Sequence, residues 1–199
     1  MLIFLKLGGS LITDKEKPLT PQRDLIAQAS AEIAQAVREN PDLKLLIGHG
    51  SGSFGHVIAN QFQTQAGGEG ERYWDGFAKV WAAARQLNQI VIESFIEVGL
   101  RTISFPPSAG VTAANKALES WDISPIRQAL SHRLIPVVQG DVIFDTHLGG
   151  TIFSTEQIFH HLAKGLKPGR ILLAGHDKGV LRNNDQEQGV IQHITPSNF

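Results

Sequence analysis

Two glycine-rich segments contain the residues of this sequence whose types and spacing most clearly suit chemistry. Gly8-Gly9-Ser10 follows the apolar run LIFLKL at 2–7, and HGSGSFGH at 49–56 follows LKLLIG at 43–48. Glycine lets backbone N–H groups approach a ligand closely, and an oriented set of N–H groups suits phosphate oxygens. Each segment alone could equally be a tight turn with positive φ. Two such segments, each directly after a predicted strand, favour phosphate binding.

Three basic side chains stand next to these glycines. Lys6 lies in the first apolar run, where an unpaired buried lysine is costly, so we expect it to point toward the glycines and meet phosphate. The alternative is a lysine that faces water from an edge strand. Lys15 approaches the first loop from its far side, or is an ordinary surface lysine. His56 ends the second loop, where its ring N–H can donate to a phosphate, unless it faces solvent at a helix start.

Several carboxylates near the ends of predicted strands or helices could orient a lysine or meet Mg²⁺, but capping or solvation explains each one better on its own. They are Asp141, Asp145, Glu156, Asp177 and Asp185. The chain has no cysteine and no H-x-x-x-H pair on a predicted helix. We therefore expect no metal site built from thiolates or histidines.

The segment GSGSFG at 50–55 formally matches G-x-G-x-x-G, the motif of dinucleotide-binding folds. Such folds place an acidic residue about 20 positions further on, at the end of a second strand. Here that region reads EGERYWD, a polar loop, which disfavours a dinucleotide-dependent oxidoreductase. The chain also lacks GxxxxGK[ST], so a P-loop kinase is not indicated.

Short apolar runs alternate with amphipathic helical segments. Strands are predicted at 2–7, 43–48, 101–105, 134–140 and, as a further buried strand, 170–175. Helices are predicted from Thr20 as N-cap with Pro21 first, from Gly76 after a loop at 63–74, over 122–133, and after the capping box of Ser154 and Gln157. With a hairpin at 140–154, this pattern predicts an α/β fold with a mainly parallel sheet. Ligands of such sheets bind beyond the carboxyl ends of the strands, so both glycine segments and Gly140-Asp141 should converge on one crevice.

Composition narrows the class of protein. The chain has 199 residues, of which 42% are hydrophobic, and a formal net charge of −1. That suits a single globular domain and gives no sign of a nucleic-acid partner. The first fifteen residues lack the basic segment and long apolar stretch of a signal peptide, and no run approaches the roughly 20 apolar residues of a membrane span. We therefore expect a soluble, cytoplasmic protein with no membrane partner.

Five segments, in this order, resemble the amino-acid-kinase superfamily: LKLGGSLITDK, IGHGSGSFGH, VVQGDVIFD, GGTIFSTEQIF and RILLAGHDKGV. Within it, GSGSFGH followed by the helix from Gly76 and GLRTISFPPSA is similar to the isopentenyl phosphate kinases. The resemblance implies an αβα sandwich formed as one domain over 1–199, with an acceptor lobe to about residue 165 and a nucleotide lobe from 166. The family continues with a DVTGG turn and a nucleotide-contacting lysine beyond the equivalent of Phe199, so we expect a truncated C-terminal lobe.

The resemblance also implies an activity, transfer of the γ-phosphoryl group of ATP to isopentenyl phosphate with Mg²⁺, in a homodimer. It implies that Lys6 bridges the transferring phosphoryl group and Lys15 stabilises the transition state. The nucleotide phosphates are expected at Lys6, Gly8, Gly9, Ser10, Gly52 and Asp177. The acceptor phosphate is expected at Ser51, Gly55, His56 and Gly140. The isoprenoid tail is expected to contact Phe77, Val80, Val142 and Ile152.

The sequence departs from the family pattern at three places. Ser51 replaces a common glycine, Glu156 stands where many members carry aspartate, and AGHDKGV replaces the usual TDVDGV. Two alternatives therefore stay open. One is a kinase for another small phosphate or phosphonate, such as a fosfomycin-kinase-like enzyme, which the apolar pair Phe77 and Val80 disfavours. The other is a non-catalytic nucleotide-binding module with the same fold.

Overall fold

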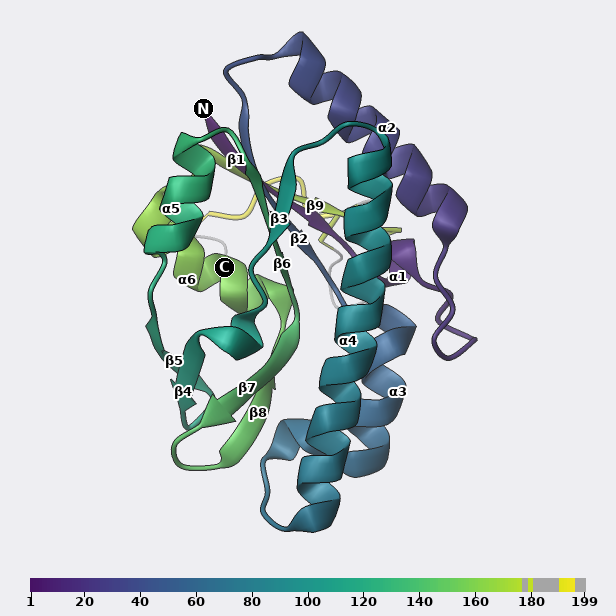
Figure 1. Ribbon diagram of the computed structural model, residues 1–199, viewed down its shortest axis with the longest axis vertical. Coiled ribbons are helices and arrows are strands. Elements are labelled where there is room, and N and C mark those ends of the chain that lie inside the picture. The colour runs from purple at the N-terminus through teal and green to yellow at the C-terminus, as the bar shows by residue number, and fades with distance from the viewer. Residues whose placement is uncertain (177–178, 181–189, 196–199) are drawn as a thin grey trace.

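The structure is a computed structural model that describes residues 1–176, 179–180 and 190–195. Its centre is a parallel five-stranded sheet (Figure 1). In spatial order the strands are β3 (Thr102–Ser104), β6 (Ile135–Gln139), β2 (Lys44–His49), β1 (Leu2–Leu7) and β9 (Arg170–Ala174). All five predicted strands are present, so the expectation of an α/β fold with a mainly parallel sheet is confirmed.

Helices cover both faces of this sheet, which gives the predicted αβα sandwich (Figure 1). Alternate strand residues face opposite layers, so Leu45 and Ile47 pack in one core while Leu46 packs in the other. The first core lies under α1 (Gly9–Ile12), α2 (Arg23–Glu39), α3 (Gly52–Phe62) and α4 (Glu71–Glu97). The second core lies under α5 (Ser124–Ser131) and α6 (Thr155–Leu166). No helix in these described ranges is long and apolar enough to cross a membrane.

A second, four-stranded sheet packs beside α6 and was predicted only in part. Its order is β5 (Ala117–Trp121), β4 (Val111–Ala114), β7 (Asp141–Asp145) and β8 (Gly149–Phe153), and two 3₁₀ turns, η1 (Thr64–Ala66) and η2 (Pro107–Ala109), flank it. The β7–β8 hairpin is the predicted one. The β4–β5 hairpin was missed because its strands are short, and because its turn at Asn115-Lys116 uses positive φ at two non-glycine residues.

Asp145 holds the turns of the second sheet together. Its carboxylate accepts hydrogen bonds from the backbone N–H groups of Asn115, Lys116, His147 and Leu148, at 2.8–3.1 Å. Burial alone would raise the pKa of Asp145, but these four donors outweigh burial and lower it to about 2. Among the carboxylates considered as site residues, Asp145 is therefore structural.

Two helix starts differ from the sequence prediction. α2 begins at Arg23 rather than after Thr20, because Pro21 is engaged in a β-bridge with Thr13. α4 begins at Glu71 rather than near Gly76. Gly76 therefore lies in the interior of this helix. A glycine is needed there because α3 approaches closely, and a Cβ at Gly76 would overlap the Phe62 side chain.

The prediction of a buried strand at 170–175 was wrong. β9 is the outer strand of the five-stranded sheet in the described part of the chain, and Ile171, Leu172 and Leu173 are 45–64% exposed. The apolar run indicates the strand correctly, but periodicity cannot tell an inner strand from an outer one.

Candidate functional site

A cavity of about 620 Å³ lies at the carboxyl ends of β1, β2 and β6, as expected for a parallel sheet. The glycine segments after all three strands meet there. Its polar end is lined by Lys6, Gly9, Ser10, Lys15, Ser51, Gly52, Gly55, His56 and Gly140. The structure thus brings together nine of the residues that the sequence analysis assigned to phosphate binding or catalysis.

The two glycine loops touch backbone to backbone. A Cβ on Gly9 would lie 2.6 Å from the amide nitrogen of Gly52, and a Cβ on Gly50 would lie 2.8 Å from the nitrogen of Gly9. Gly52 also has φ +47°, a conformation that favours glycine. These glycines are therefore needed for close approach of the loops, whichever ligand the loops bind.

Thr13 links the two loops and was not identified from the sequence. Its hydroxyl donates to the Gly9 carbonyl at 2.7 Å and accepts from the Ser53 N–H at 3.0 Å. The side chain is buried, and it lies at the end of α1. A threonine four residues after a glycine has no distinctive motif, so only the folded contact reveals this link.

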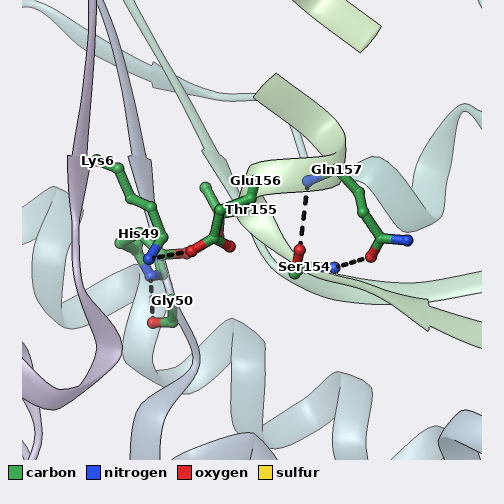
Figure 2. Close-up of polar contacts among 7 residues, drawn as sticks. All are labelled: Lys6, His49, Gly50, Ser154, Thr155, Glu156 and Gln157. Carbon is green, nitrogen blue, oxygen red and sulfur yellow. Dashed lines mark hydrogen bonds and ion pairs between the residues drawn. The ribbon is translucent and has the colours of Figure 1, made fainter. Parts of the chain in front are cut away.

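Lys6 points out of β1 toward the start of α6. Its ammonium group lies 2.7 Å from the Glu156 carboxylate, and its side chain is 14% exposed (Figure 2). Burial raises the pKa of Glu156, but the hydrogen bond and charge of Lys6 contribute to a net lowering, which keeps this carboxylate ionised. Lys6 is therefore a partly buried, paired cation that faces the cavity rather than a lysine facing water.

The N-terminus of α6 supports this ion pair. Ser154 caps the helix, its hydroxyl accepting from the Gln157 N–H at 3.2 Å while the Gln157 side chain accepts from the Ser154 N–H at 2.8 Å (Figure 2). The predicted capping box is confirmed. The Thr155 hydroxyl donates to the His49 carbonyl at 2.6 Å, which ties the first turn of α6 to the end of β2. Glu156 is thus held opposite Lys6 by local sequence and by a long-range hydrogen bond.

The two histidines that flank the second loop have different environments. His49 is fully buried, and its ring nitrogens contact the Gly50 carbonyl and Asn88 Oδ1, both at 3.1 Å. Burial lowers the pKa of His49, so the ring is neutral and structural at physiological pH. His56 is exposed and lines the cavity. Its Nδ1 donates to the Gly52 carbonyl at 2.8 Å, which leaves Nε2 as the nitrogen available to a ligand.

Asp141 lines the cavity next to Gly140 but is almost fully buried. One carboxylate oxygen accepts from the Ser108 N–H at 3.1 Å and the other from the Val142 N–H at 2.9 Å. Burial raises the pKa of Asp141 to about 6, against the lowering effect of these two donors. The carboxylate anchors η2 beside the cavity.

Three of the glycine amides predicted at the phosphates are already bonded within the protein. The Gly8 N–H donates to the Ala174 carbonyl at 2.7 Å, the Gly55 N–H to the Ser51 carbonyl at 3.4 Å, and the Gly140 N–H to the His49 carbonyl at 3.2 Å. Gly8 does not line the cavity, whereas Gly140 does. Asp177 and Asp185 lie outside the described residues. Amides that contact a phosphate must therefore come from other positions of these loops, and the first turn of α3 begins at Gly52.

The other end of the cavity is apolar. Val80 and Ile152, two of the residues expected at the isoprenoid tail, line it together with Val57, Ala59 and Ala84, which the sequence analysis did not identify. Phe77 and Val142 lie behind this wall, in a buried cluster with Val80. Phe77 also packs against Trp74 and Phe144, with ring centroids 5.3 and 5.1 Å apart. The cavity therefore joins a polar, lysine-containing end to an apolar end that aromatic rings support from behind.

The whole chain matches a known family. A sequence model described as Amino acid kinase family matches residues 1–199. The chain is 33% identical over 192 residues to isopentenyl phosphate kinase of Methanocaldococcus jannaschii, an alignment that covers 92% of this chain and 72% of that protein.

Solved structures give the same result. One described as isopentenyl phosphate kinase has a TM-score of 0.84 and 35% identity, and the match covers 90% of this chain and 75% of the other. A product complex of isopentenyl phosphate kinase from T. acidophilum has a TM-score of 0.82 and 28% identity, covering 95% of this chain and 76% of the other.

Proposed function

The chain belongs to the isopentenyl phosphate kinases of the amino acid kinase family, and on that premise we propose that it transfers the γ-phosphoryl group of ATP to isopentenyl phosphate, giving isopentenyl diphosphate. One observation of the structure carries the proposal. A single cavity joins both glycine loops and the partly buried cation Lys6 to an apolar wall. An acceptor with a phosphate head and a hydrocarbon tail matches these two ends.

For this reaction the protein has mainly to position the two substrates and to neutralise their negative charge. An oxygen of the acceptor phosphate forms a new bond to the γ-phosphorus, while the bond from that phosphorus to the oxygen leaving with ADP breaks. The acceptor oxygen is already anionic, so no strong base has to remove a proton. Positioning and electrostatic stabilisation then supply most of the rate enhancement.

We assign the cavity residues to these tasks. Lys6 neutralises charge on the transferring phosphoryl group, and Lys15 stabilises the transition state from the opposite side. Gly9, Ser10 and Gly52 hold the nucleotide phosphates. Ser51, Gly55, His56 and Gly140 surround the acceptor phosphate, with His56 Nε2 as donor when the ring is protonated. Contacts from Gly8, Asp177, Phe77 and Val142 to a ligand stay predictions.

The apolar end of the cavity determines the specificity for the acceptor. Each CH₂ group buried there contributes about 0.8 kcal/mol, so a five-carbon tail gains a few kcal/mol over a small polar phosphate. This favours isopentenyl phosphate over the acceptor of a fosfomycin-kinase-like enzyme. The paired, partly buried Lys6 favours catalysis over a binding module, because such a cation has a direct role in phosphoryl transfer.

Mg²⁺ is expected to enter with ATP. In the described ranges no three His, Cys, Asp or Glu side chains are grouped to hold a metal ion. Of the carboxylates that line the cavity, Asp141 accepts two N–H groups and Glu156 pairs with Lys6. The described residues therefore do not form a protein-built metal site, which fits an ion held mainly by the nucleotide phosphates and water.

Three further properties stay predictions. They are the homodimer, the cytoplasmic location, and the division into an acceptor lobe up to about residue 165 and a nucleotide lobe from 166. β9, the first strand of the proposed nucleotide lobe, pairs with β1 of the acceptor lobe. The proposed boundary therefore crosses one continuous sheet.

A coupled assay of ADP release tests the function. The chain is incubated with ATP and Mg²⁺ against isopentenyl phosphate, longer isoprenyl phosphates, small polar monophosphates and fosfomycin. We expect the highest kcat/KM for isopentenyl phosphate. Preference for a polar phosphate or for fosfomycin would favour the alternative kinase, and ATP binding without turnover of any acceptor would favour the binding module.

A further inference from the structure

Thr13 occupies the junction of the two glycine loops. It is 1% exposed, and its single hydroxyl uses both hydrogen-bonding directions across the loops, donating to Gly9 and accepting from Ser53. Gly9 and Ser53 are 44 positions apart in sequence and belong to the loops after β1 and β2. A hydroxyl group can donate one hydrogen bond and accept others. Because the Thr13 hydroxyl bonds to Gly9 as a donor and to Ser53 as an acceptor, it holds the two loops at a defined distance from each other.

The surroundings leave Thr13 little freedom to move. Its backbone N–H donates to the Gly9 carbonyl at 3.0 Å, and Thr13 forms a β-bridge with Pro21. On the other side Gly52 lies so close to Thr13 that a Cβ at Gly52 would overlap the Thr13 hydroxyl. The hydroxyl is therefore anchored on both sides at the position where the loops meet.

We propose that Thr13 is a positioning residue that sets the separation between the phosphoryl donor and the acceptor. The inference rests on the proposed function, in which Gly9 and Ser10 of the first loop hold the nucleotide phosphates and Ser51, Gly55 and His56 of the second loop surround the acceptor phosphate. Thr13 exchanges no proton and touches neither reactant. It acts by holding the Gly9 side and the Ser53 side of the cavity at one distance.

The reaction gives this distance its importance. In phosphoryl transfer the attacking oxygen, the phosphorus and the leaving oxygen must lie nearly in line, and small misplacements of the reactants lower the rate strongly. Each loop retains its own binding contacts if the link between them is lost. Loss of the Thr13 hydroxyl should therefore reduce kcat while the affinities for ATP and acceptor change little.

Thr13→Val and Thr13→Ser test this role. Valine keeps the shape but removes the hydroxyl, so the Ser53 N–H and the Gly9 carbonyl each lose a partner. Serine keeps the hydroxyl and loses only a methyl group. We expect Thr13→Val to lower kcat about tenfold or more, with both KM values and the calorimetric Kd for ATP within about twofold, and Thr13→Ser to recover most of kcat.

Ser30→Ala is the matched control. Ser30 is a fully buried hydroxyl that donates to the Ile26 carbonyl at 2.8 Å and contacts the Ser94 hydroxyl at 2.9 Å, between α2 and α4 and outside the cavity lining. Its removal should lower the unfolding temperature without lowering kcat. A similar loss of kcat in Ser30→Ala would show that Thr13→Val acts through general destabilisation and would overturn the proposal.

The remaining outcomes are also decisive. If Thr13→Val does not fold, Thr13→Ala takes its place, because it removes the hydroxyl without adding an apolar group against the loops. Wild-type kcat in the variant that lacks the hydroxyl, or an equal loss in Thr13→Ser, contradicts the role of Thr13 alone. A wild-type chain that does not turn over isopentenyl phosphate contradicts the proposed function, and the role of Thr13 falls with it.

Discussion

The Lys6 ammonium group lies 2.7 Å from the Glu156 carboxylate, and this contact joins the end of β1 to the start of α6 at the mouth of the glycine loops. The pair holds a cation at the carboxyl end of the sheet before any ligand binds. Because the Lys6 side chain is only 14% exposed, a phosphoryl group near it would meet a charge that water screens weakly. In the proposed reaction, this is the cation that neutralises charge on the transferring phosphoryl group.

Lys6→Met should lower kcat by about 10²-fold or more while changing the KM values much less, because the lost interaction is stronger in the transition state than in the bound substrates. Steady-state kinetics with both substrates varied gives the two parameters separately. Lys44→Met is the control, because Lys44 begins β2 at the opposite end of the sheet and is exposed. An unchanged kcat in Lys6→Met would remove Lys6 from the chemistry.

His56→Ala should reduce kcat/KM for the acceptor by about 10²-fold, the cost of one preorganised donor, and leave the Kd for ATP nearly unchanged. The reason is the geometry of the ring, whose Nδ1 is engaged by the Gly52 carbonyl while Nε2 remains for the acceptor phosphate. Calorimetry with ATP and kinetics with isopentenyl phosphate separate the two effects. His132→Ala, an exposed histidine at the end of α5, is the control. Wild-type turnover in His56→Ala would contradict the assignment.

Substitutions of the apolar wall should shift the preferred length of the acceptor tail. Ala84→Leu adds bulk to the cavity wall itself and should weaken isopentenyl phosphate several-fold. Phe77→Ala removes a ring behind Val80 and should lower kcat/KM for isopentenyl phosphate while raising it for ten- and fifteen-carbon phosphates, since the space opens toward Trp74 and Phe144. The ratios of kcat/KM between chain lengths are the measurement. Unchanged ratios in Phe77→Ala would make Phe77 ordinary core.

Two buried carboxylates should affect stability in different pH ranges. The pKa of Asp145 is lowered to about 2, so it stabilises the fold above its ordinary value of 3.8, and this contribution is lost as pH falls from 3.8 toward 2. Asp145→Asn should therefore be destabilised at neutral pH, with the difference from wild type shrinking toward pH 2. Urea unfolding across this range measures it, and a pH-independent difference would contradict the assignment.

Acidification should affect the stability of the fold in the opposite direction through Asp141. Burial raises its pKa from 3.8 to about 6, so the ionised carboxyl costs stability above pH 6, and this cost disappears as pH falls from 6 to 4. Wild-type stability should carry a favourable component on acidification through this window, which Asp141→Asn abolishes. If the two proteins show the same pH dependence between 4 and 6, the Asp141 carboxyl has an ordinary pKa.

Local sequence patterns were sufficient for the five strands of the parallel sheet and for the meeting point of the glycine loops. Buried β-strands are short apolar runs, and the carboxyl ends of parallel strands share one edge, so the convergence of Gly9, Gly52 and Gly140 follows from chain order. The start of α6 was also predictable, because the capping box of Ser154 and Gln157 is a local device.

The structural features that could not be predicted from the sequence depend on contacts between distant segments of the chain. Thr13 lies within the segment LKLGGSLITDK, but its contact with the second loop becomes visible only in the fold, where Gly52 packs against it. Phe77 and Val80 share one helix face, but only the packing of the second sheet decides that Val80 lines the cavity and Phe77 lies behind it. The exposure of β9 likewise depends on its place in the sheet rather than on its composition.

Direct identification of the product tests the central claim. The wild-type chain is incubated with isopentenyl phosphate, ATP and Mg²⁺, and the organic phosphates are followed by mass spectrometry and ³¹P NMR. We expect isopentenyl diphosphate to form in equal amount to ADP, and Lys6→Met to form it at a small fraction of that rate. Unchanged isopentenyl phosphate, with ATP either intact or converted to ADP and inorganic phosphate, would contradict the proposed function.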